Sequence, residues 1–476
     1  MPKPKLYHLL ERLDGRELPW LDKFLASPYF NSNPWPQKLW EVLRPAHPRY
    51  DAFSKEQVFE QLCPGKPFDF KLLNDRYSEL SRLVEEFFFQ QSFRREEPLQ
   101  RRARRAAYRS RRLYGLFSKE SRRQAAHLLS RPYRSPENLA EALEVFSEHY
   151  IHPESKSHAE EGADINRAVE QLDQHFVLLK LKFASDQLAR QLAHRAPLDG
   201  RFLEAALNEA PALESVHPAI ELYRRIVLLF QEGCPDEGFR DTRELFFSLG
   251  EALPPDEQSF ALAKLATLAY WRLNQGRQHY LEELYELFRY GDAHRLFVFH
   301  GVMSDATFLN VCTVASQIGH YGWARQFIRA NQAYLPAAAV PDAVALGQAI
   351  VLFAREDFAG AHHQLNEVYK KQSAYKLRVR SLYVRCLLGM HLEDPRYDEP
   401  LRSALEAFGQ YIRRHKSLSP QRKREYLNFA RAVKKIALLR SQAWHSSRAR
   451  AATLEWVGQL QPLVLGPWLR KQLERE

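Results

Sequence analysis

Glycine and cysteine are both scarce in this sequence, and each scarcity argues against a class of structure. Only 19 of the 476 residues are glycine. No Asn-Gly or Asp-Gly pair separates two alternating apolar runs, so the usual signals of β-hairpins are missing. The four cysteines are far apart in the sequence, which argues against a disulfide framework or a zinc site. We interpret them as small buried residues in a reducing compartment: Cys63, Cys234, Cys312 and Cys386.

Long hydrophobic runs are also missing. The most apolar stretch, residues 343–354, is about 12 residues long, whereas a helix needs about 20 residues to span a bilayer. The residues after Met1 do not form the apolar core of a signal peptide. We therefore expect a cytoplasmic protein without a transmembrane segment.

The residues that are abundant indicate an all-α fold. Hydrophobic residues make up 45% of the chain and charged residues 27%, the balance of a folded protein rather than a disordered one. Leu, Ala, Glu, Arg and Gln are common, and these residues lose little free energy in a helix. The 27 prolines fall mostly between helical patterns, where they end helices. A chain of this length predicts two or three domains or one elongated repeat array.

A strongly basic segment lies between Arg94 and Arg134. It has 13 Arg and one Lys against three Glu, a net charge of +11, which equals the formal charge of the whole chain. The pattern predicts an amphipathic helix with a packing stripe of small and apolar residues: Ala103, Ala106, Ser110, Leu113 and Phe117. The candidate basic patch lies on the other faces: Arg101, Arg102, Arg104, Arg105, Arg109, Arg111 and Arg112.

Three interpretations of this patch stay open. It is a solvated face neutralised by Glu from a neighbouring helix, a surface that holds nucleic-acid phosphates, or a surface for an acidic protein or anionic lipid. A run of charged residues is most often a solvated helix face of the first kind. Aromatic residues are few in the segment, among them Tyr108, Tyr114 and Phe117, so a platform for stacked bases has little support.

The first ninety residues predict a compact helical module. Its strongest periodicity consists of apolar residues at steps of 4, 3, 4 and 3: Leu73, Tyr77, Leu80, Val84 and Phe87. The expected partner of this apolar face is the Arg-rich helix after Pro98. Residues 54–88 also loosely resemble a helix-turn-helix or winged-helix core. Acidic side chains on the second element, among them Asp75 and Glu79, disfavour insertion into a DNA groove.

Further along, a long helix is expected over residues 164–194, with one apolar face: Val169, Leu172, Phe176, Leu179 and Phe183. From about residue 225 a repeat with a period near 40 residues appears. In each unit an aromatic residue is followed three positions later by a small residue. The pairs are Phe239 with Thr242, Tyr321 with Ala324, Phe358 with Ala361, and Tyr397 with Pro400. This spacing predicts two helices per unit.

These units resemble degenerate tetratricopeptide repeats. The clearest copy covers residues 306–336 and has Gly319 and Tyr321 at the turn, Ala324 in the second helix and Pro336 at the close. The resemblance implies an α-solenoid of stacked antiparallel helical hairpins over residues 225–415. The spacing exceeds the family's usual length, so longer helices are implied. The first 130 residues, with the turn at 27–31, resemble uncharacterised helical-repeat proteins of bacteria, which implies no activity.

In the tetratricopeptide family, peptides lie in a concave groove lined by the first helix of each hairpin. This resemblance implies a candidate groove in which the residues are mostly apolar and suit an apolar helix or an extended segment, including one from the same chain. The alternative is that they belong to the core, because a register error of one residue exchanges the two faces. The candidate residues are Tyr270, Leu273, Leu309, Thr313, Leu346, Ile350 and Phe353.

The chain lacks the common catalytic motifs. There is no phosphate-binding Gly loop, no Gly-x-Ser-x-Gly and no His-Glu-x-x-His. A histidine cluster, His149, His152 and His158 with Glu148 and Glu154, lies in or beside a polar linker, and we predict no metal there. We expect neither an enzyme nor a bound cofactor.

Five segments follow from these patterns: an N-terminal module at 1–92, a basic helical segment at 93–152, a helical connector at 163–224, the repeats at 225–415, and capping helices at 416–476. The resulting hypothesis is a scaffold that binds a protein partner through a curved surface. The alternative is a nucleic-acid-associated regulator that uses the basic segment.

Overall fold

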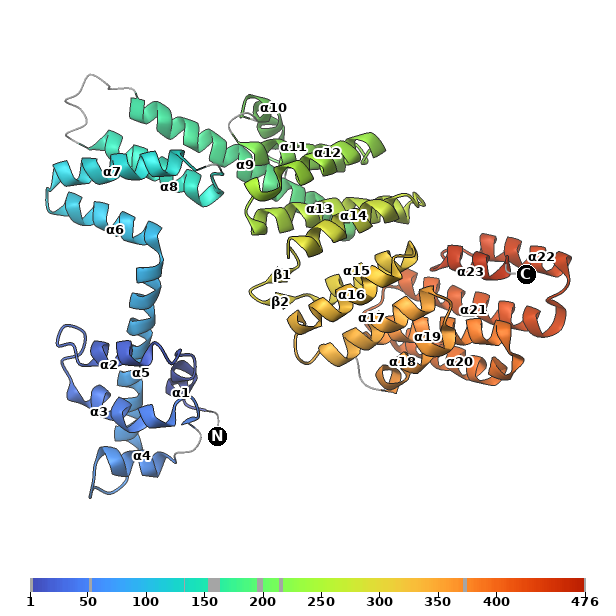
Figure 1. The fold of residues 1–476 in the computed structure, drawn as a ribbon, viewed down its shortest axis with the longest axis horizontal. Helices are drawn as coiled ribbons and strands as arrows, with labels where there is room; N and C mark the ends of the chain where they lie inside the picture. The colour runs from blue at the N-terminus through green and yellow to red at the C-terminus, as the bar shows by residue number, and fades with distance from the viewer. Residues whose placement is uncertain are drawn as a thin grey trace. The chain divides into compact units, whose positions relative to one another are not determined.

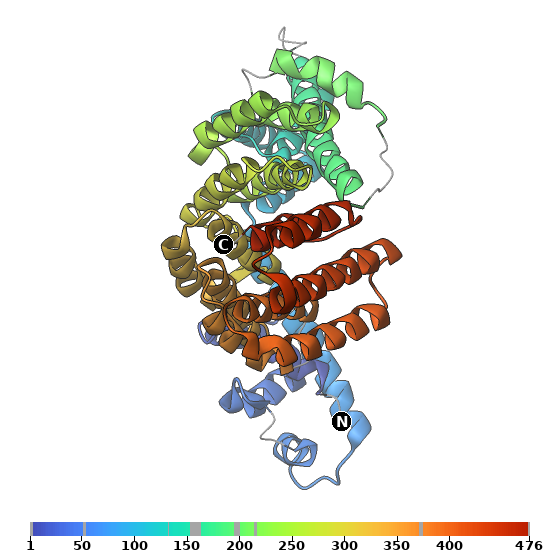
Figure 2. The ribbon, with the colours of Figure 1, turned by 90° about the vertical axis from the view of Figure 1, so that its right-hand side faces the viewer.

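The protein is helical throughout the part that the structure describes. The structure is a computed structural model and describes residues 3–50, 54–131, 133–152, 163–194, 200–213, 217–370 and 375–474. These residues form 23 α-helices and one pair of two-residue strands. Figure 1 and Figure 2 show the arrangement of the helices from two sides. The all-α prediction is confirmed. None of the described helices is long and apolar enough to cross a bilayer.

The chain divides into two compact units, Met1–Asp173 and Gln174–Glu476. The boundary falls inside α9, which runs over Ala163–His194. The first unit contains eight further helices: α1 (Lys5–Leu10), α2 (Leu18–Leu25), α3 (Pro34–Leu43), α4 (Lys55–Leu62), α5 (Phe70–Arg95), α6 (Glu97–Ser110), α7 (Tyr114–Leu129) and α8 (Pro136–Ile151). The five segment boundaries that the sequence suggests stay predictions.

The second unit continues from α9 as a succession of helices: α10 (Leu203–Leu213), α11 (Pro218–Gln231), α12 (Asp236–Leu249), α13 (Pro255–Asn274), α14 (Tyr280–Ala293), α15 (Asp305–Gln317), α16 (Tyr321–Asn331), α17 (Val340–Ala354), α18 (Phe358–Lys370), α19 (Lys376–Glu393), α20 (Asp398–Arg414), α21 (Pro420–Ala443), α22 (Ser447–Gln459) and α23 (Gly466–Leu473). Between α14 and α15, β1 (Val298–Phe299) pairs with β2 (Val302–Met303) in antiparallel fashion.

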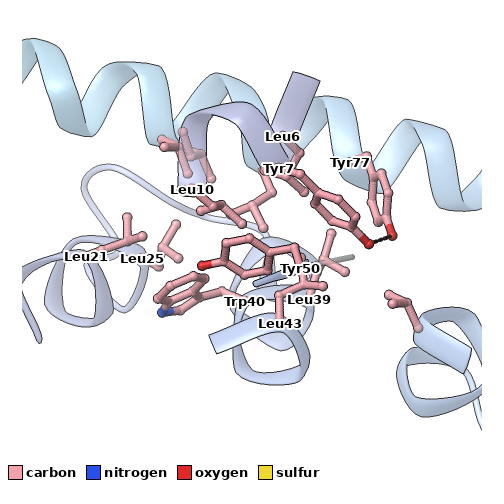
Figure 3. Packing of buried hydrophobic residues seen from close by; sticks show 14 of the residues in the cluster. Leu6, Tyr7, Leu10, Leu21, Leu25, Leu39, Trp40, Leu43, Tyr50 and Tyr77 are labelled. Atoms are coloured by element: carbon pink, nitrogen blue, oxygen red, sulfur yellow. Dashed lines mark hydrogen bonds between the residues drawn. The ribbon is translucent and has the colours of Figure 1, made fainter. Parts of the chain in front are cut away.

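The N-terminal module has its own apolar core, drawn in Figure 3. The apolar face of α5 is buried as predicted, but it packs on α1, α2 and α3 rather than mainly on the Arg-rich helix. Across this core the hydroxyl of Tyr7 is 2.9 Å from that of Tyr77. Asp69 caps the N-terminus of α5 and Glu79 pairs with Arg76 at 3.1 Å, so these carboxylates have structural roles.

The predicted apolar face of α9 is largely exposed. Val169, Leu172, Phe176 and Phe183 are each between 42% and 57% exposed. The opposite face of the helix is buried instead and includes Leu178 and Leu181. This result follows from the composition of the helix, because α9 carries apolar residues on more than one side and only one side packs.

In the second unit, each aromatic-plus-small motif lies at or near the start of a helix. Phe239 lies in α12, Tyr321 begins α16 and Phe358 begins α18. The small residues Ala324 and Ala361 that follow are completely buried. Helices α11 to α20 pack on their neighbours in the chain, and α11 with α13, α15 with α17, and α17 with α19 are also in contact.

The connections inside four successive helix pairs, from α11–α12 to α17–α18, share one backbone geometry. A residue with positive φ follows a helix: Gly233 (73°), Gly276 (91°), Gly319 (86°) and Glu356 (65°), which lie 43, 43 and 37 residues apart. The next N–H then donates to a carbonyl five residues earlier: Cys234 to Leu229 (2.8 Å), Arg277 to Arg272 (3.2 Å), His320 to Ala315 (2.9 Å) and Asp357 to Leu352 (3.0 Å). This is the Schellman arrangement, and its recurrence shows that successive helix pairs turn in the same way.

We expect the Gly319→Ala variant to be destabilised by about 1 kcal/mol, because alanine is strained at positive φ. Hydrogen exchange in peptides covering α15 and α16 measures this effect. The control is Gly322→Ala, in the first turn of α16 with nothing within 4 Å of an added Cβ. We expect the control to change stability by less than about 0.5 kcal/mol. Equal effects from the two substitutions would contradict the argument.

The C-terminal helices share one core with α19 and α20. Phe408, Phe429, Val433 and Ile436 are completely buried in this cluster. In Figure 2 the helices α20 to α23 face the viewer, coloured from orange to dark red. The predicted cap at 416–476 therefore consists of packed helices.

Candidate interaction site

A cavity of about 360 Å³ lies among α16, α17 and α18. Its floor is apolar, because the side chains of Ile328 and Val351 are buried there. It is lined by Arg325, Ile328, Arg329, Gln348, Val351, Leu352, Arg355 and Gln364. Helices α16 and α17 each contribute positions one helical turn apart, and α18 contributes Gln364.

Three arginines surround the apolar floor, and all three are exposed: Arg325, Arg329 and Arg355. Within the described ranges, none of them is in an ion pair. Arg329 Nε lies 3.4 Å from the carbonyl of Arg325, one turn earlier in α16. Helix α16 itself contains no Asp or Glu. The site therefore combines unneutralised positive charge with an apolar surface.

This combination suits a ligand that has carboxylates next to an apolar side chain. A guanidinium binds a carboxylate through two parallel hydrogen bonds, and such charge-assisted bonds are stronger than neutral ones. Gln348 and Gln364 add neutral donors and acceptors. The residues that line the site are Arg, Gln, Ile, Val and Leu, which differ from the nucleophile-and-base pairs of hydrolytic enzymes.

The predicted groove residues lie mostly in the core or beside other parts of the chain. Leu309 and Leu346 are completely buried, so these two side chains belong to the core and do not line a free surface. The hydroxyl of Thr313 donates to the carbonyl of Leu309 in its own helix at 2.7 Å. Leu273 and Ile350 are half-buried. Burial raises the pKa of the Tyr270 hydroxyl.

The last groove residue, Phe353, is covered by the protein's own C-terminal helix. Its ring centroid is 5.8 Å from that of Trp468 in α23, and the Arg385 guanidinium lies 4.8 Å from it. A side-chain hydrogen bond also joins α15 and α19, in which the Arg378 guanidinium donates to the amide oxygen of Asn310 at 3.1 Å. The open cavity thus lies on a neighbouring face of α17, at Gln348 and Arg355 rather than at Leu346 and Phe353.

The chain matches no protein-family model, no curated protein and no solved structure. The resemblance to tetratricopeptide repeats therefore stays an expectation, and the interpretation of the site rests on its own geometry.

The arginines of the predicted basic patch are largely neutralised. Arg105 is completely buried, and its Nε donates to Glu148 at 2.8 Å. Four others are also in ion pairs: Arg101 with Glu97, Arg102 with Glu144 (2.8 Å), Arg104 with Glu120 (3.4 Å) and Arg109 with Glu148 (3.4 Å). Arg111 donates to the carbonyl of Ala107, and Arg112 has a φ of 56° just after α6. The neutralised face is thus the interpretation that the structure favours.

The predicted packing stripe of this helix is wrong. Ala103, Ala106 and Ser110 are exposed, and α6 ends before Leu113 and Phe117. The face that packs is the one that carries Arg105. The reason is the matched spacing of opposite charges, since Arg105 and Arg109 on α6 meet Glu144 and Glu148 on α8.

The candidate metal ligands have other partners. His149 Nδ1 is 2.6 Å from Asp164, and His152 is buried against the rings of Tyr114 and Phe117. His158 and Glu154 lie outside the described residues. In the part of the chain that the structure describes, no group of three His, Cys, Asp or Glu side chains is arranged to hold a metal ion.

The four cysteines are buried and free, which confirms their assignment as small buried residues. Burial raises the pKa of the Cys234 thiol to about 11 and that of Cys386 to about 12. Both thiols are therefore protonated at neutral pH, and a protonated thiol is a poor nucleophile.

Sequence analysis did not identify Arg325, Arg329 and Arg355. The available signal was local, since Arg325 and Arg329 are four residues apart on a helix without a carboxylate. Arg355 and the apolar floor join them only when α16, α17 and α18 pack together, and no periodicity within one helix shows that packing.

Proposed function

We propose that this protein is a non-catalytic scaffold that binds a protein partner, and that the partner docks an acidic segment with an apolar side chain in the cavity among α16, α17 and α18. The observation that carries the proposal is the apolar floor surrounded by three arginines that form no ion pair with any residue the structure describes. Arginine is favoured at such interfaces because it combines a fixed charge with a planar, weakly hydrated group.

The arrangement of the second unit supports this proposal. Successive helix pairs with the same turn geometry are what a solenoid of stacked hairpins requires, and such arrays expose extended surfaces for partners. The contacts between α15 and α17 and between α17 and α19 agree with stacking of this kind. A partner segment held across α16 to α18 would contact two adjacent hairpins.

The alternative function is nucleic-acid binding through the segment between Arg94 and Arg134. It has less support, because five arginines of that patch already pair with glutamates. A phosphate backbone would have to displace these carboxylates.

A peptide library tests the scaffold proposal on the full-length chain. Twelve-residue peptides carry one Leu, Ile or Phe flanked by Asp and Glu, and a matched set carries Lys at the acidic positions. We expect fluorescence anisotropy to show binding of the acidic set alone. The Arg325→Glu/Arg329→Glu variant should lose at least about tenfold in affinity, because each charge-assisted contact contributes about 1.5–3 kcal/mol.

The control variant is Arg240→Glu/Arg277→Glu, which makes the same change in charge at exposed positions outside the cavity. We expect its affinity to stay within about twofold of the wild type, since distant surface charges are screened. An equal loss in both variants would show a general charge effect, and the absence of any bound peptide would refute the docking site.

A further inference from the structure

A second basic segment lies at the C-terminal end of the protein, between Arg413 and Arg450. It contains twelve Lys and Arg residues against one Glu, a net charge of +11. The formal charge of the whole chain does not reveal this segment, because acidic residues elsewhere in the chain offset its positive charge. The two basic segments therefore have the same net charge, but they differ in how many of their cations are in ion pairs.

Some of the C-terminal cations have internal partners. Arg422 pairs with Glu425 at 2.8 Å, and Arg440 donates to the carbonyl of Leu392 at 2.8 Å. Lys435 lies 4.2 Å from the ring centroid of Trp456. These side chains have structural roles, and they are set aside.

Six cations at the end of α20 and along α21 are exposed and, within the described ranges, form no ion pair: Arg413, Arg414, Lys416, Arg424, Arg431 and Lys434. The first three lie at the end of α20 and just beyond it, and the others lie along α21. The two groups are close, because Lys423 donates to the carbonyl of Arg413 at 3.2 Å. This is the opposite of α6, where glutamates of α6, α7 and α8 pair with the arginines.

The position of these charges on α21 is not explained by helix stability. Arg422, Lys423 and Arg424 lie within the first five residues of the helix, where no acidic residue is present. The N-terminus of a helix carries partial positive charge, so cations there are unfavourable and anions are favourable. Arg413 and Arg414, by contrast, lie at the C-terminus of α20, where a cation is favourable.

The spacing along α21 suits a chain of phosphates. Arg424, Arg431 and Lys434 are seven and three residues apart, so they lie on one side of the helix. They span ten residues, or about 15 Å. One strand of DNA carries a phosphate about every 3.4 Å along the axis, so about four phosphates fit over this length.

A lipid surface fits less well. Helices that bind membranes insert an apolar face, with Lys and Arg on the polar side. The apolar face of α21, which includes Phe429, Val433 and Ile436, is buried in the core of the unit and is not available for insertion. Only the electrostatic part of such an interaction remains.

We propose that the end of α20 and the exposed side of α21 bind the phosphate backbone of a nucleic acid. The contact is electrostatic and independent of base sequence. It is separate from the cavity among α16, α17 and α18, so a scaffold held on a nucleic acid can carry a protein partner at the same time.

The test uses the full-length protein with three probes: a 20-nucleotide single-stranded DNA, the RNA of the same sequence and the corresponding DNA duplex, each at several salt concentrations. Six phosphate contacts predict that log K falls against log salt with a slope of about −5 for the duplex. The Arg424→Glu/Arg431→Glu/Lys434→Glu variant should lose at least about tenfold in affinity at about 100 mM salt, and its slope should be shallower by about 3.

The matched control is Arg111→Glu/Lys119→Glu/Arg122→Glu, which makes the same change in charge at exposed positions of the first basic segment. Affinity close to the wild type in this control, with loss in the α21 variant, supports the proposal. A second α21 variant with Gln at the three positions must show a smaller loss in the same direction, and circular dichroism checks the folding of each variant.

Other outcomes overturn the proposal. Equal loss in both Glu variants would show that affinity depends on net charge or on the first basic segment as well, so α21 would not be a distinct site. Failure to bind any of the three nucleic acids at low salt would exclude the site. Binding to vesicles of phosphatidylserine and phosphatidylcholine without binding to nucleic acid would assign the surface to a membrane instead.

Discussion

The Arg105→Ala variant is expected to lose about 3 kcal/mol of stability in the part of the protein formed by α6, α7 and α8. Arg105 is completely buried, and its guanidinium group donates to Glu148 and Gln124. Without it, Glu148 keeps Arg109, at 3.4 Å, as its one ion-pair partner among the described residues, and its side chain is 16% exposed. An unpaired buried carboxylate is costly, and we place the effect at the low end of the known range because Arg109 stays in place.

Hydrogen exchange in peptides from α6 to α8 measures this loss locally, which avoids mixing it with the unfolding of other parts. The control is Arg102→Ala, where the pair with Glu144 at 2.8 Å lies at the surface. We expect a loss of less than about 1 kcal/mol there. In the double variant Arg105→Met/Glu148→Leu, most of the stability should return, because neither charge is left alone. A small effect of Arg105→Ala would mean that the buried pair contributes little.

The Gly389→Ala variant is expected to be destabilised by about 2 kcal/mol. A Cβ atom at position 389 would lie 2.5 Å from the ring of Phe358, which is 3% exposed. The ring has little room to move, because the ring centroid of Phe353 is 5.5 Å away. The substitution also gains up to about 1 kcal/mol of helix propensity, so the net effect is smaller than the packing cost alone.

The control for this prediction should change stability in the opposite direction. At Gly409 in α20, an added Cβ would meet only the flexible end of Arg413 at 3.6 Å. Gly409→Ala should therefore stabilise the protein by about 0.5–1 kcal/mol. Thermal unfolding of both variants followed by circular dichroism separates the two signs. Stabilisation by Gly389→Ala would show that α18 and α19 pack less tightly than the structure indicates.

The helical nature of the chain and the position of its motifs could be predicted from the sequence, because both depend on local patterns. Phe358 and Ala361 lie at the start of α18, and Tyr321 and Ala324 lie at the start of α16, as two helices per unit require. Gly319 has the positive φ that its predicted place in a turn calls for. These signals need no information from distant parts of the chain.

The packing face of α6 could not be predicted from its own residues. An amphipathic pattern assumes that alanine lies inside and arginine outside. Here Arg105 is inside, because Glu144 and Glu148 approach from α8, about forty residues later in the sequence. Spacing within α6 alone cannot show a partner of this kind.

Two residues of the predicted groove were assigned to the wrong face of their helices for a related reason. The groove register placed Leu309 and Leu346 on a surface, but both residues are in the core. Each helix in the centre of a helical array contacts neighbours on several sides, so the choice between a core face and a free face depends on the positions of the other helices. The cavity beside Arg355 is visible only once three helices are in place.

The shared turn geometry also has a kinetic consequence. Each of the four turns closes through a hydrogen bond between residues five apart in the chain, so a helix pair can form before any distant segment arrives. The N-terminal module is different, because Tyr7 must meet Tyr77 across seventy residues of chain. Loop-closure entropy delays contacts of that kind. During synthesis, the N-terminal core must therefore wait for α5 to emerge, whereas the later helix pairs can fold one after another as each is completed.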